Sequence, residues 1–244
     1  MPDLGKGPRI SMPSPVVGIE IHGQCKWAPL YAPRVVRNFA IVGQKASSTD
    51  EFILDDLPGT SGRLDVLVRC LRAAMLSSHG IRRGVVVYLV LLGGKRAPRV
   101  VRVDGAAVLF LRPDERSLAV RMKKVLATHA DEETSAWVTA RPGFAVARGG
   151  FERVLADVDD AVPYILDEGG LDIREAPGLG ASHGLFVIGD HLGLPDDVRL
   201  RLEGMNAQRI SVGPVSVHAD DVVTLVTNEL DRCVVKLRSG REPQ

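Results

Sequence analysis

The chain has 244 residues, 45% of them hydrophobic and 25% charged, which is the composition of an ordinary globular protein with one sizeable core. Its 31 basic and 30 acidic residues nearly cancel, so net charge alone indicates neither a nucleic-acid nor a membrane partner. The absence of a long apolar run, of a signal-peptide core and of paired cysteines (only Cys25, Cys70 and Cys233 occur) excludes membrane and disulfide-rich secreted classes and predicts a cytoplasmic protein.

The first part of the chain has an unpatterned start and then a strand and a helix. Residues 1–37 are rich in proline and show no periodicity, which predicts a disordered or atypical N-terminal extension. A first strand is expected over Asn38–Ala46. A helix is expected from Leu64 to about Ser78, because its apolar residues recur on one helical face. Thr60 or Ser61 can cap that helix.

Two strands and a second helix follow. The run VVVYLVLL (Val85–Leu92) is continuous and β-branched, as in the interior of a parallel sheet, and Arg99–Val103 is its predicted partner. In RPDERSLAVRMKKVLATH, Pro113 suits the first helical position, and Asp114 and Glu115 suit the positive end of a helix.

The second half of the chain repeats this alternation. Strands are predicted over three apolar runs, Val162–Leu166, Leu185–Gly189 and Gln208–Val212, and helices over Asp196–Met205 and His218–Arg232. Such alternation indicates an α/β domain with a mainly parallel sheet, and periodicity alone favours a Rossmann-like arrangement.

Three successive strands end in loops rich in glycine or proline: ILDEGG, VIGDHLG and ISVGP. Ligands of open α/β sheets bind at the carboxyl ends of the strands, where glycine lets the backbone come close. The loops therefore predict a cofactor site. The alternative is that these residues only separate one strand from the next.

Other site chemistries find less support. Asp190, His191 and His218 are candidate metal donors, but neither an HxxxH nor a CxxC spacing accompanies them, so we expect no metal. A serine hydrolase would need a GxSxG elbow, which is missing. The segment GLGASHG precedes a strand, whereas a dinucleotide loop follows one.

Charge is unevenly distributed despite the neutral total. Between Arg63 and Arg102 there are nine basic residues and one acid, Asp65. Such a local field can hold a polyanion, although a set of solvated helix faces would give the same pattern.

Several motifs in series resemble one family. The segments DDLPGTSGRLDVLVRCLRAAMLSSHGIRRGVVVYLVL, RPDERSLAVRMKKVL, FVIGDHLG and QRISVGPVSVHAD are similar to the tRNA (pseudouridine-54-N1)-methyltransferase family TrmY. That family belongs to the SPOUT class of S-adenosylmethionine (SAM) methyltransferases. The resemblance implies a methyltransferase domain over residues 38–235, a C-terminal tail over 236–244, an α/β trefoil knot with a mainly parallel sheet, and a homodimer. The knot runs against general topology rules.

The resemblance also implies where the methyl donor SAM would bind. The three loops would wrap it, with no metal, through Leu166, Gly189, Asp190, His191, Ile210, Ser211, Val212, Gly213, Pro214 and Val215. Gly213 stands where relatives often have a second serine. Cys233 is a further candidate, because relatives often place a cysteine beside the cofactor near their C-terminus.

The substrate would be tRNA, methylated at N1 of pseudouridine 54. Asp65 is the candidate base or orienting group, with Arg63 beside it, and its alternative role is complementing a helix dipole. Arg82, Arg83 and Arg116 are candidate RNA contacts. Two alternatives stay open: a SPOUT methyltransferase with another RNA target, and a catalytically silent RNA-binding homologue.

Overall fold

The computed structural model describes residues 36–130, 135–158 and 160–239, and side chains as far as residue 235. The predicted extension over residues 1–37 and the end of the predicted tail therefore lie almost entirely outside the described residues. Within them, eight strands form one sheet in the order β10-β8-β9-β1-β4-β5-β7-β6. Their bounds are β1 Arg37–Ser47, β4 Val85–Gly93, β5 Arg99–Asp104, β6 Val138–Arg141, β7 Phe144–Arg148, β8 Val162–Asp172, β9 Gly184–Gly189 and β10 Gln208–Ser211.

The sheet has a parallel part and an antiparallel part. The five strands from β10 to β4 are all parallel, and β5, β7 and β6 extend the sheet by antiparallel pairing. In the register of the three central strands, Phe39 of β1 lies beside Val87 of β4 on one side and Phe186 of β9 on the other. The prediction of an α/β fold with a large, mainly parallel sheet is confirmed.

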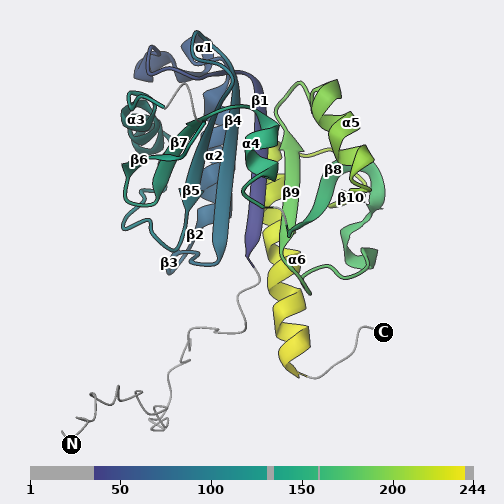
Figure 1. The fold of residues 1–244 in the computed structure, drawn as a ribbon. Helices are drawn as coiled ribbons and strands as arrows, with labels where there is room; N and C mark the ends of the chain where they lie inside the picture. The colour runs from purple at the N-terminus through teal and green to yellow at the C-terminus, as the bar shows by residue number, and fades with distance from the viewer. Residues whose placement is uncertain (1–35, 131–134, 159, 240–244) are drawn as a thin grey trace, which may run out of the picture. The chain divides into compact units, whose positions relative to one another are not determined.

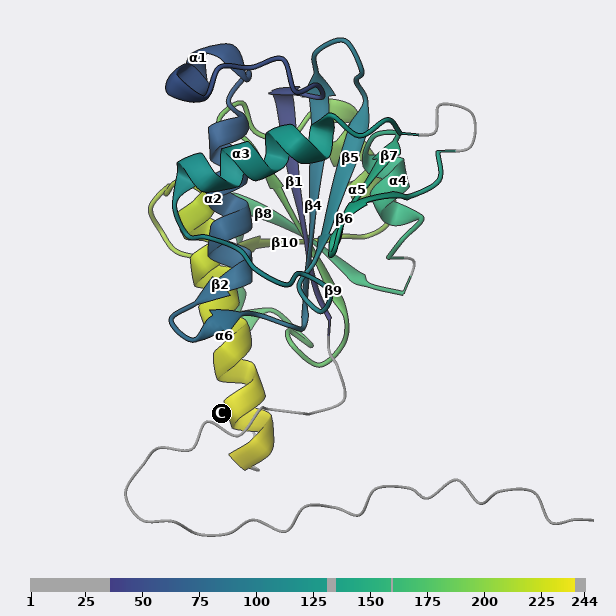
Figure 2. The same cartoon turned by 90° about the vertical axis from the view of Figure 1, so that its left-hand side faces the viewer.

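Helices cover both faces of the sheet (Figure 1). On one face, Phe39 and Ile41 of β1 pack with α2 (Leu64–Met75), α3 (Glu115–Leu126) and α6 (Ala219–Ser239). On the other face, Ala40 and Val42 pack with α4 (Phe151–Leu155) and α5 (Asp196–Gly204). Strand side chains alternate between faces, so the continuous apolar run Phe39–Val42 of β1 contributes to two cores. Figure 2 shows α3 crossing α2 on the first face.

The start of α2 is held by the loop before it. This loop follows a 3-10 turn (Leu54–Asp56) and the short helix α1 (Leu57–Thr60). Ser61 is fully buried, and its Oγ accepts a hydrogen bond from the Leu64 amide at 3.1 Å. Of the two predicted capping residues, Ser61 is thus the one that satisfies a free amide at this helix end. At α3, the cap is Asp114, whose carboxylate accepts from the Ser117 amide at 2.8 Å, so Pro113 lies outside the helix.

The predicted elements are all present, and three of them have different ends: α2, β8, and α6, which runs to Ser239 rather than Arg232. Helix α2 stops at Met75 and is followed by the small hairpin of β2 (Leu76–Ser77) and β3 (Gly80–Ile81). Strand β8 runs to Asp172 instead of Leu166, because it continues as a polar strand that pairs with β10. Strands β6 and β7 and helix α4 were not predicted. Within the described residues, no helix has the length and apolar composition needed to cross a membrane.

Candidate active site at the carboxyl ends of the parallel strands

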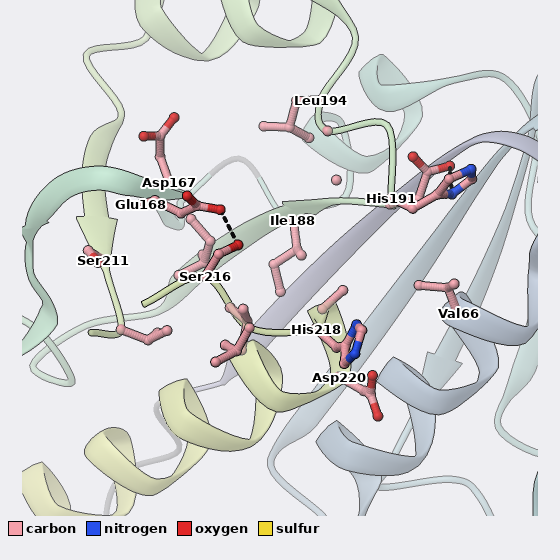
Figure 3. A pocket seen from close by; sticks show the side chains of 18 of the residues that line it. Val66, Asp167, Glu168, Ile188, His191, Leu194, Ser211, Ser216, His218 and Asp220 are labelled. Carbon is pink, nitrogen blue, oxygen red and sulfur yellow. Dashed lines mark hydrogen bonds and ion pairs between the residues drawn. The ribbon is translucent and has the colours of Figure 1, made fainter. Parts of the chain in front are cut away.

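A cavity of about 810 Å³ lies where β8, β9 and β10 end (Figure 3). One wall consists of Leu166 and the following residues of β8, the loop after β9 and the loop after β10. The opposite wall comes from α2, through Arg63, Val66 and Arg69. The first turn of α6 also contributes. The site thus occupies the edge of the sheet at which ligands of open α/β folds bind.

Nine of the eleven residues predicted to bind the cofactor line this cavity: Leu166, Gly189, Asp190, His191, Ile210, Ser211, Val212, Gly213 and Val215. Pro214 does not line it. Cys233 does not line it either, because it lies 14 residues beyond the start of α6, or about 21 Å along a helix. Its side chain instead faces Gly180, where a Cβ atom would come within 2.9 Å of the Cys233 Cβ.

The loop after β9 is built around Asp190. Its carboxylate is buried and accepts hydrogen bonds from the amides of Gln44 and Leu192, each at 2.8 Å. These bonds tie the loop to the end of β1, so the carboxylate of Asp190 has a structural role in holding the loop. His191 follows it at the cavity, its Nδ1 3.9 Å from the Asp190 carboxylate.

Gly189 is required by this loop itself. A Cβ at position 189 would lie 2.2 Å from the carbonyl carbon of Gly193 and 2.6 Å from the Leu194 amide nitrogen. The chain therefore folds back against Gly189. Sequence reasoning attributed the glycine to close approach of a cofactor, and the structure supplies a nearer reason.

The loop after β10 is more open. The Ser211 hydroxyl donates to the Gly213 carbonyl at 2.8 Å and lies 3.3 Å from the Gly213 amide nitrogen. A Cβ on Gly213 would meet no atom within 4 Å. This loop thus presents backbone groups to the cavity with room for a ligand beside them.

The wall formed by β8 is acidic. Asp167 accepts hydrogen bonds from Arg209 at 2.9 Å and from Arg199 at 3.3 Å. Burial raises the pKa of Asp167, but these arginines and the Gly169 amide outweigh it and hold the pKa below its ordinary value. Glu168 beside it accepts from the Ser216 hydroxyl. Sequence reasoning missed both acids, although they directly follow the apolar run that it assigned to a strand.

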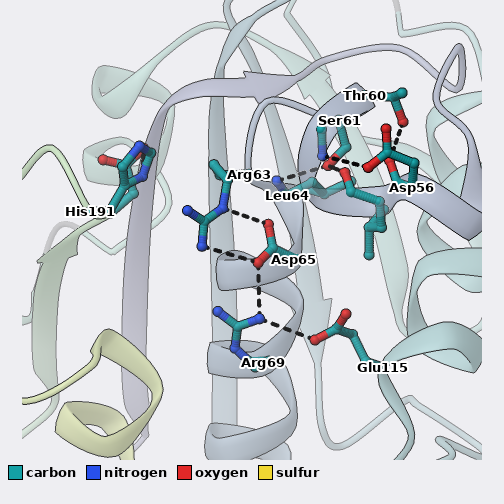
Figure 4. A network of polar contacts seen from close by, with 12 residues as sticks. Asp56, Thr60, Ser61, Arg63, Leu64, Asp65, Arg69, Glu115 and His191 are labelled. Carbon is teal, nitrogen blue, oxygen red and sulfur yellow. Dashed lines mark hydrogen bonds and ion pairs between the residues drawn. The ribbon is translucent and has the colours of Figure 1, made fainter.

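The opposite wall holds a carboxylate between two guanidinium groups (Figure 4). Asp65 Oδ1 accepts from Arg63 Nε at 3.1 Å, and Oδ2 accepts from Arg63 Nη2 at 3.3 Å and Arg69 Nη1 at 2.9 Å. The Asp65 side chain is only 2% exposed and does not line the cavity, whereas both arginines do. Arg63 has φ of 70°, in the left-handed region, and follows Gly62 at 63°. The backbone thus turns sharply to bring Arg63 to the cavity.

The charges in this network reinforce one another. Burial alone raises the pKa of Asp65, but hydrogen bonds from Arg63 and Arg69 dominate and lower it. Burial lowers the pKa of Arg69, while hydrogen bonds to Asp65 and Glu115 raise it. Asp65 and Arg69 are therefore both held in their charged forms, and Asp65 is a weak base.

The predicted RNA contacts Arg82 and Arg83 lie at the other end of the parallel strands, just before β4. Arg82 Nη1 donates to Asp231 of α6 at 2.9 Å. Arg83 Nη1 donates to the carbonyls of Gly105 and Val108, at 3.0 and 2.7 Å. Both guanidinium groups thus have internal partners, and neither lines the cavity. Arg116 is exposed in α3, 2.5 Å from Asp55.

The described residues contain no cluster of three or more His, Cys, Asp or Glu side chains arranged to hold a metal ion. The cavity instead combines backbone loops with apolar side chains, which is the usual lining of a site for an organic cofactor.

This chain belongs to a family of SAM-dependent RNA methyltransferases. The family profile described as "Putative SAM-dependent RNA methyltransferase" matches residues 36–235. The curated relatives that it resembles are named tRNA (pseudouridine(54)-N(1))-methyltransferase. The protein of Methanococcoides burtonii is 38% identical over 199 residues, which cover 81% of this chain and 96% of that protein. The protein of Methanocaldococcus jannaschii is 34% identical over 202 residues, covering 81% and 97%.

Among solved structures, the chain is similar to Archaeoglobus fulgidus Nep1 bound to S-adenosylhomocysteine. The TM-score is 0.56 at 16% sequence identity, over 81% of this chain and 98% of that one. At this level of identity the likeness concerns the fold.

Proposed function

We propose that the protein transfers a methyl group from SAM to N1 of pseudouridine 54 in the T-loop of tRNA. Family membership and the names of relatives at 34–38% identity support the reaction. The observation that carries the proposal is that one cavity combines two kinds of wall. Glycine-rich loops form one wall, and the two arginines that bind the buried Asp65 carboxylate form the other.

The cavity fits the cofactor in size and lining. Its volume is within the roughly 300–1,000 Å³ of small-molecule sites. SAM supplies an electrophilic methyl group on a positively charged sulfur. Leu166, Ile210 and Val212 would cover the faces of the adenine, and backbone groups of the same loops would contact its edge. Glu168, whose carboxylate forms no salt bridge with a described residue, complements the positive charge of the ligand. We leave Cys233 and Pro214 out of this set.

The arginine wall would receive the RNA. Arg63 and Arg69 present guanidinium donors suited to a phosphate or to the carbonyl oxygens of a base. Of the two roles considered for Asp65, we propose the orienting one, because both of its oxygens are occupied by arginines and its pKa is lowered. Asp65 is then a positioning residue. Its contribution to the rate is the fixed placement of the base against the methyl group. N1 would give its proton to water and take the methyl group from the sulfonium, which would leave as S-adenosylhomocysteine.

We further propose that the C-terminal segment is threaded as a trefoil knot and that two copies form a homodimer beside the cavity. The similarity of fold to Nep1 supports the knot. Exposed apolar side chains at the cavity rim, Val215 and Val217, and Leu225 on α6 support the dimer, since such residues gather at interfaces between copies. Light scattering at micromolar concentration should give twice the mass of the chain.

The experiment that tests the function is methyl transfer from labelled SAM to tRNA. Two tRNAs should be compared, one with pseudouridine and one with uridine at position 54, followed by nuclease digestion and mass spectrometry. We expect N1-methylpseudouridine at position 54 of the first tRNA only. Methylation at another nucleotide would mean another RNA target, and tRNA binding without transfer would mean a silent RNA-binding homologue.

A further inference from the structure

A second groove lies beside α3, outside the cavity described above. It has a volume of about 380 Å³ and is lined by the segment before α3, one side of α3 and the end of β6. Its cations are Arg112, Arg116, Arg121, Lys124 and Arg141, and no acidic residue lines it. A groove with five cations and no carboxylate is complementary to a polyanion.

Most of these cations are available to a ligand. Arg112, Lys124 and Arg141 are exposed, and none of them forms a salt bridge with a residue that the structure describes. Among the described residues, Arg116 forms an ion pair only with the exposed carboxylate of Asp55. Arg121 has a structural task, since its guanidinium lies 5.8 Å from the centre of the Phe144 ring.

Apolar side chains stand next to this charge. Phe110, which lines the groove, is 59% exposed, and its neighbour Leu109 is 78% exposed. An exposed aromatic ring among cations is the combination with which proteins bind single-stranded nucleic acid, because bases stack on the ring while cations contact phosphates.

The segment that carries Phe110 is anchored. Arg83 donates to the carbonyls of Gly105 and Val108, two residues before Phe110. From the other side, the Arg121 guanidinium reaches the Phe110 carbonyl at 3.5 Å. Arg83 therefore has a role in presenting the groove without itself lining it.

The groove and the cavity are neighbours in the fold. Glu115, the first residue of α3, contacts Arg69 at 3.1 Å, and Arg69 lines the cavity. The next residue, Arg116, lines the groove. One RNA could therefore lie in both.

We propose that the groove beside α3 binds an unpaired segment of the RNA substrate, with Lys124, Arg141 and Arg112 contacting phosphates and Phe110 stacking on a base. The proposal rests on the proposed function, since it takes the substrate to be RNA. In this proposal, the groove beside α3 contributes to the affinity for tRNA, and the cavity binds the cofactor.

The test is tRNA binding by fluorescence anisotropy in the presence of S-adenosylhomocysteine, over a range of salt concentrations. The groove variant combines Lys124→Gln with Arg141→Gln. The control variant combines Lys95→Gln with Arg201→Gln, two exposed cations outside both sites that give the same change in net charge. We expect the groove variant to bind roughly tenfold more weakly at low salt and to lower the salt slope by about 2, one for each phosphate contact. The control should match the wild type.

Phe110 is tested separately. Phe110→Ala should weaken binding about fivefold or more, and Phe110→Trp should restore it, because stacking needs an aromatic face. Affinity for S-adenosylhomocysteine, measured by calorimetry, should be unchanged in every variant.

Three results would overturn the proposal: a groove variant that binds as the wild type does, an equal loss in the control, or a Phe110→Ala variant with full affinity. The first two would show that the groove is a solvated surface or that only total charge matters. Any of them together with normal methylation by the wild type would leave the proposed function standing. If the wild type binds no tRNA, both proposals fail.

Discussion

Among the carboxylates that hold two arginines, Asp65 and Asp231 lie at opposite ends of the parallel strands. At the carboxyl ends, Asp65 joins Arg63 and Arg69 beside the cavity. At the amino ends, Asp231 of α6 joins Arg37 at 2.6 Å and Arg82 at 2.9 Å. The Asp65 side chain is 2% exposed and that of Asp231 is 44% exposed. The same chemical unit can thus be a fixed platform for a ligand or a surface contact between elements, and burial decides which.

The largest expected effect is that of Asp65→Asn on the rate. The amide cannot hold both arginines, so their guanidinium groups should move and the single-turnover methylation rate should fall roughly 100-fold, the cost of a misplaced positioning group. Affinity for S-adenosylhomocysteine should be preserved, because the loops proposed to bind it form the wall opposite the two arginines. Loss of hydrogen bonds to charged groups should also lower the free energy of unfolding by about 1–3 kcal/mol. An unchanged rate would reduce Asp65 to a structural role.

A second contrast concerns two glycines, Gly189 at the cavity and Gly204 at the end of α5, outside the cavity. Gly189→Ala should lower affinity for S-adenosylhomocysteine roughly tenfold, because its Cβ would meet the Gly193 backbone at 2.2 Å and force the loop to shift. Gly204→Ala is the matched control, since its Cβ meets nothing within 4 Å and Gly204 does not line the cavity. Calorimetry on both variants measures the difference. Equal affinities would mean that the loop after β9 does not shape the cofactor site.

The stability contributed by Asp65 should depend on pH. Its pKa in the folded protein is lowered from 3.8, so the contribution is fully present above pH 3.8 and is lost as pH falls through the folded-state value. The difference in unfolding free energy between wild type and Asp65→Asn should therefore be constant near neutral pH and shrink below about pH 4. Chemical denaturation at several pH values checks this. A difference that grows on acidification would contradict the lowered pKa.

The smallest effect is expected at the other end of the strands. Asp231→Asn weakens half-exposed ion pairs with Arg37 and Arg82, so it should cost less than about 1 kcal/mol of stability. The methylation rate should not change. A large loss of rate would mean that α6 transmits its position to the cavity, and the contrast between the two carboxylates would then fail.

The sequence predicted the parallel core well, because β1, β4, β8 and β9 each contain a continuous apolar run. The loops after three of the strands pointed to a cofactor site, and the family resemblance then named the nine residues that line the cavity. The polar second half of β8 gave no such signal, because it is a strand only through pairing with β10. The hairpin of β6 and β7 was missed although Pro142 and Gly143 mark its turn.

Contacts between residues far apart in the sequence could not be predicted, in contrast to local ones. The ion pair of Asp65 with Arg69 is local, because the two residues are four apart on one helix, and this spacing is visible in the sequence. The partner of Arg82 is Asp231, 149 residues away in the sequence. The sequence therefore suggested an RNA contact at Arg82, whereas the fold pairs it with a carboxylate of the same chain. The family resemblance placed Cys233 in the site. Only the first turn of α6 lines the cavity, and Cys233 lies several turns further along this helix.

The position of helix α6 near the end of the chain affects the order in which the protein folds during synthesis. Its first turn lines the cavity and brings Asp220 to 3.8 Å from Arg69, and Asp231 further along meets Arg37 and Arg82. The first turn and a later turn of this helix thus dock on the first part of the described chain. Contacts of such sequence separation form slowly, because the chain between them must first be brought together. During synthesis, the cofactor pocket can therefore close only after residues beyond 219 have left the ribosome, and until then the α2 surface that α6 covers stays open to chaperones and proteases.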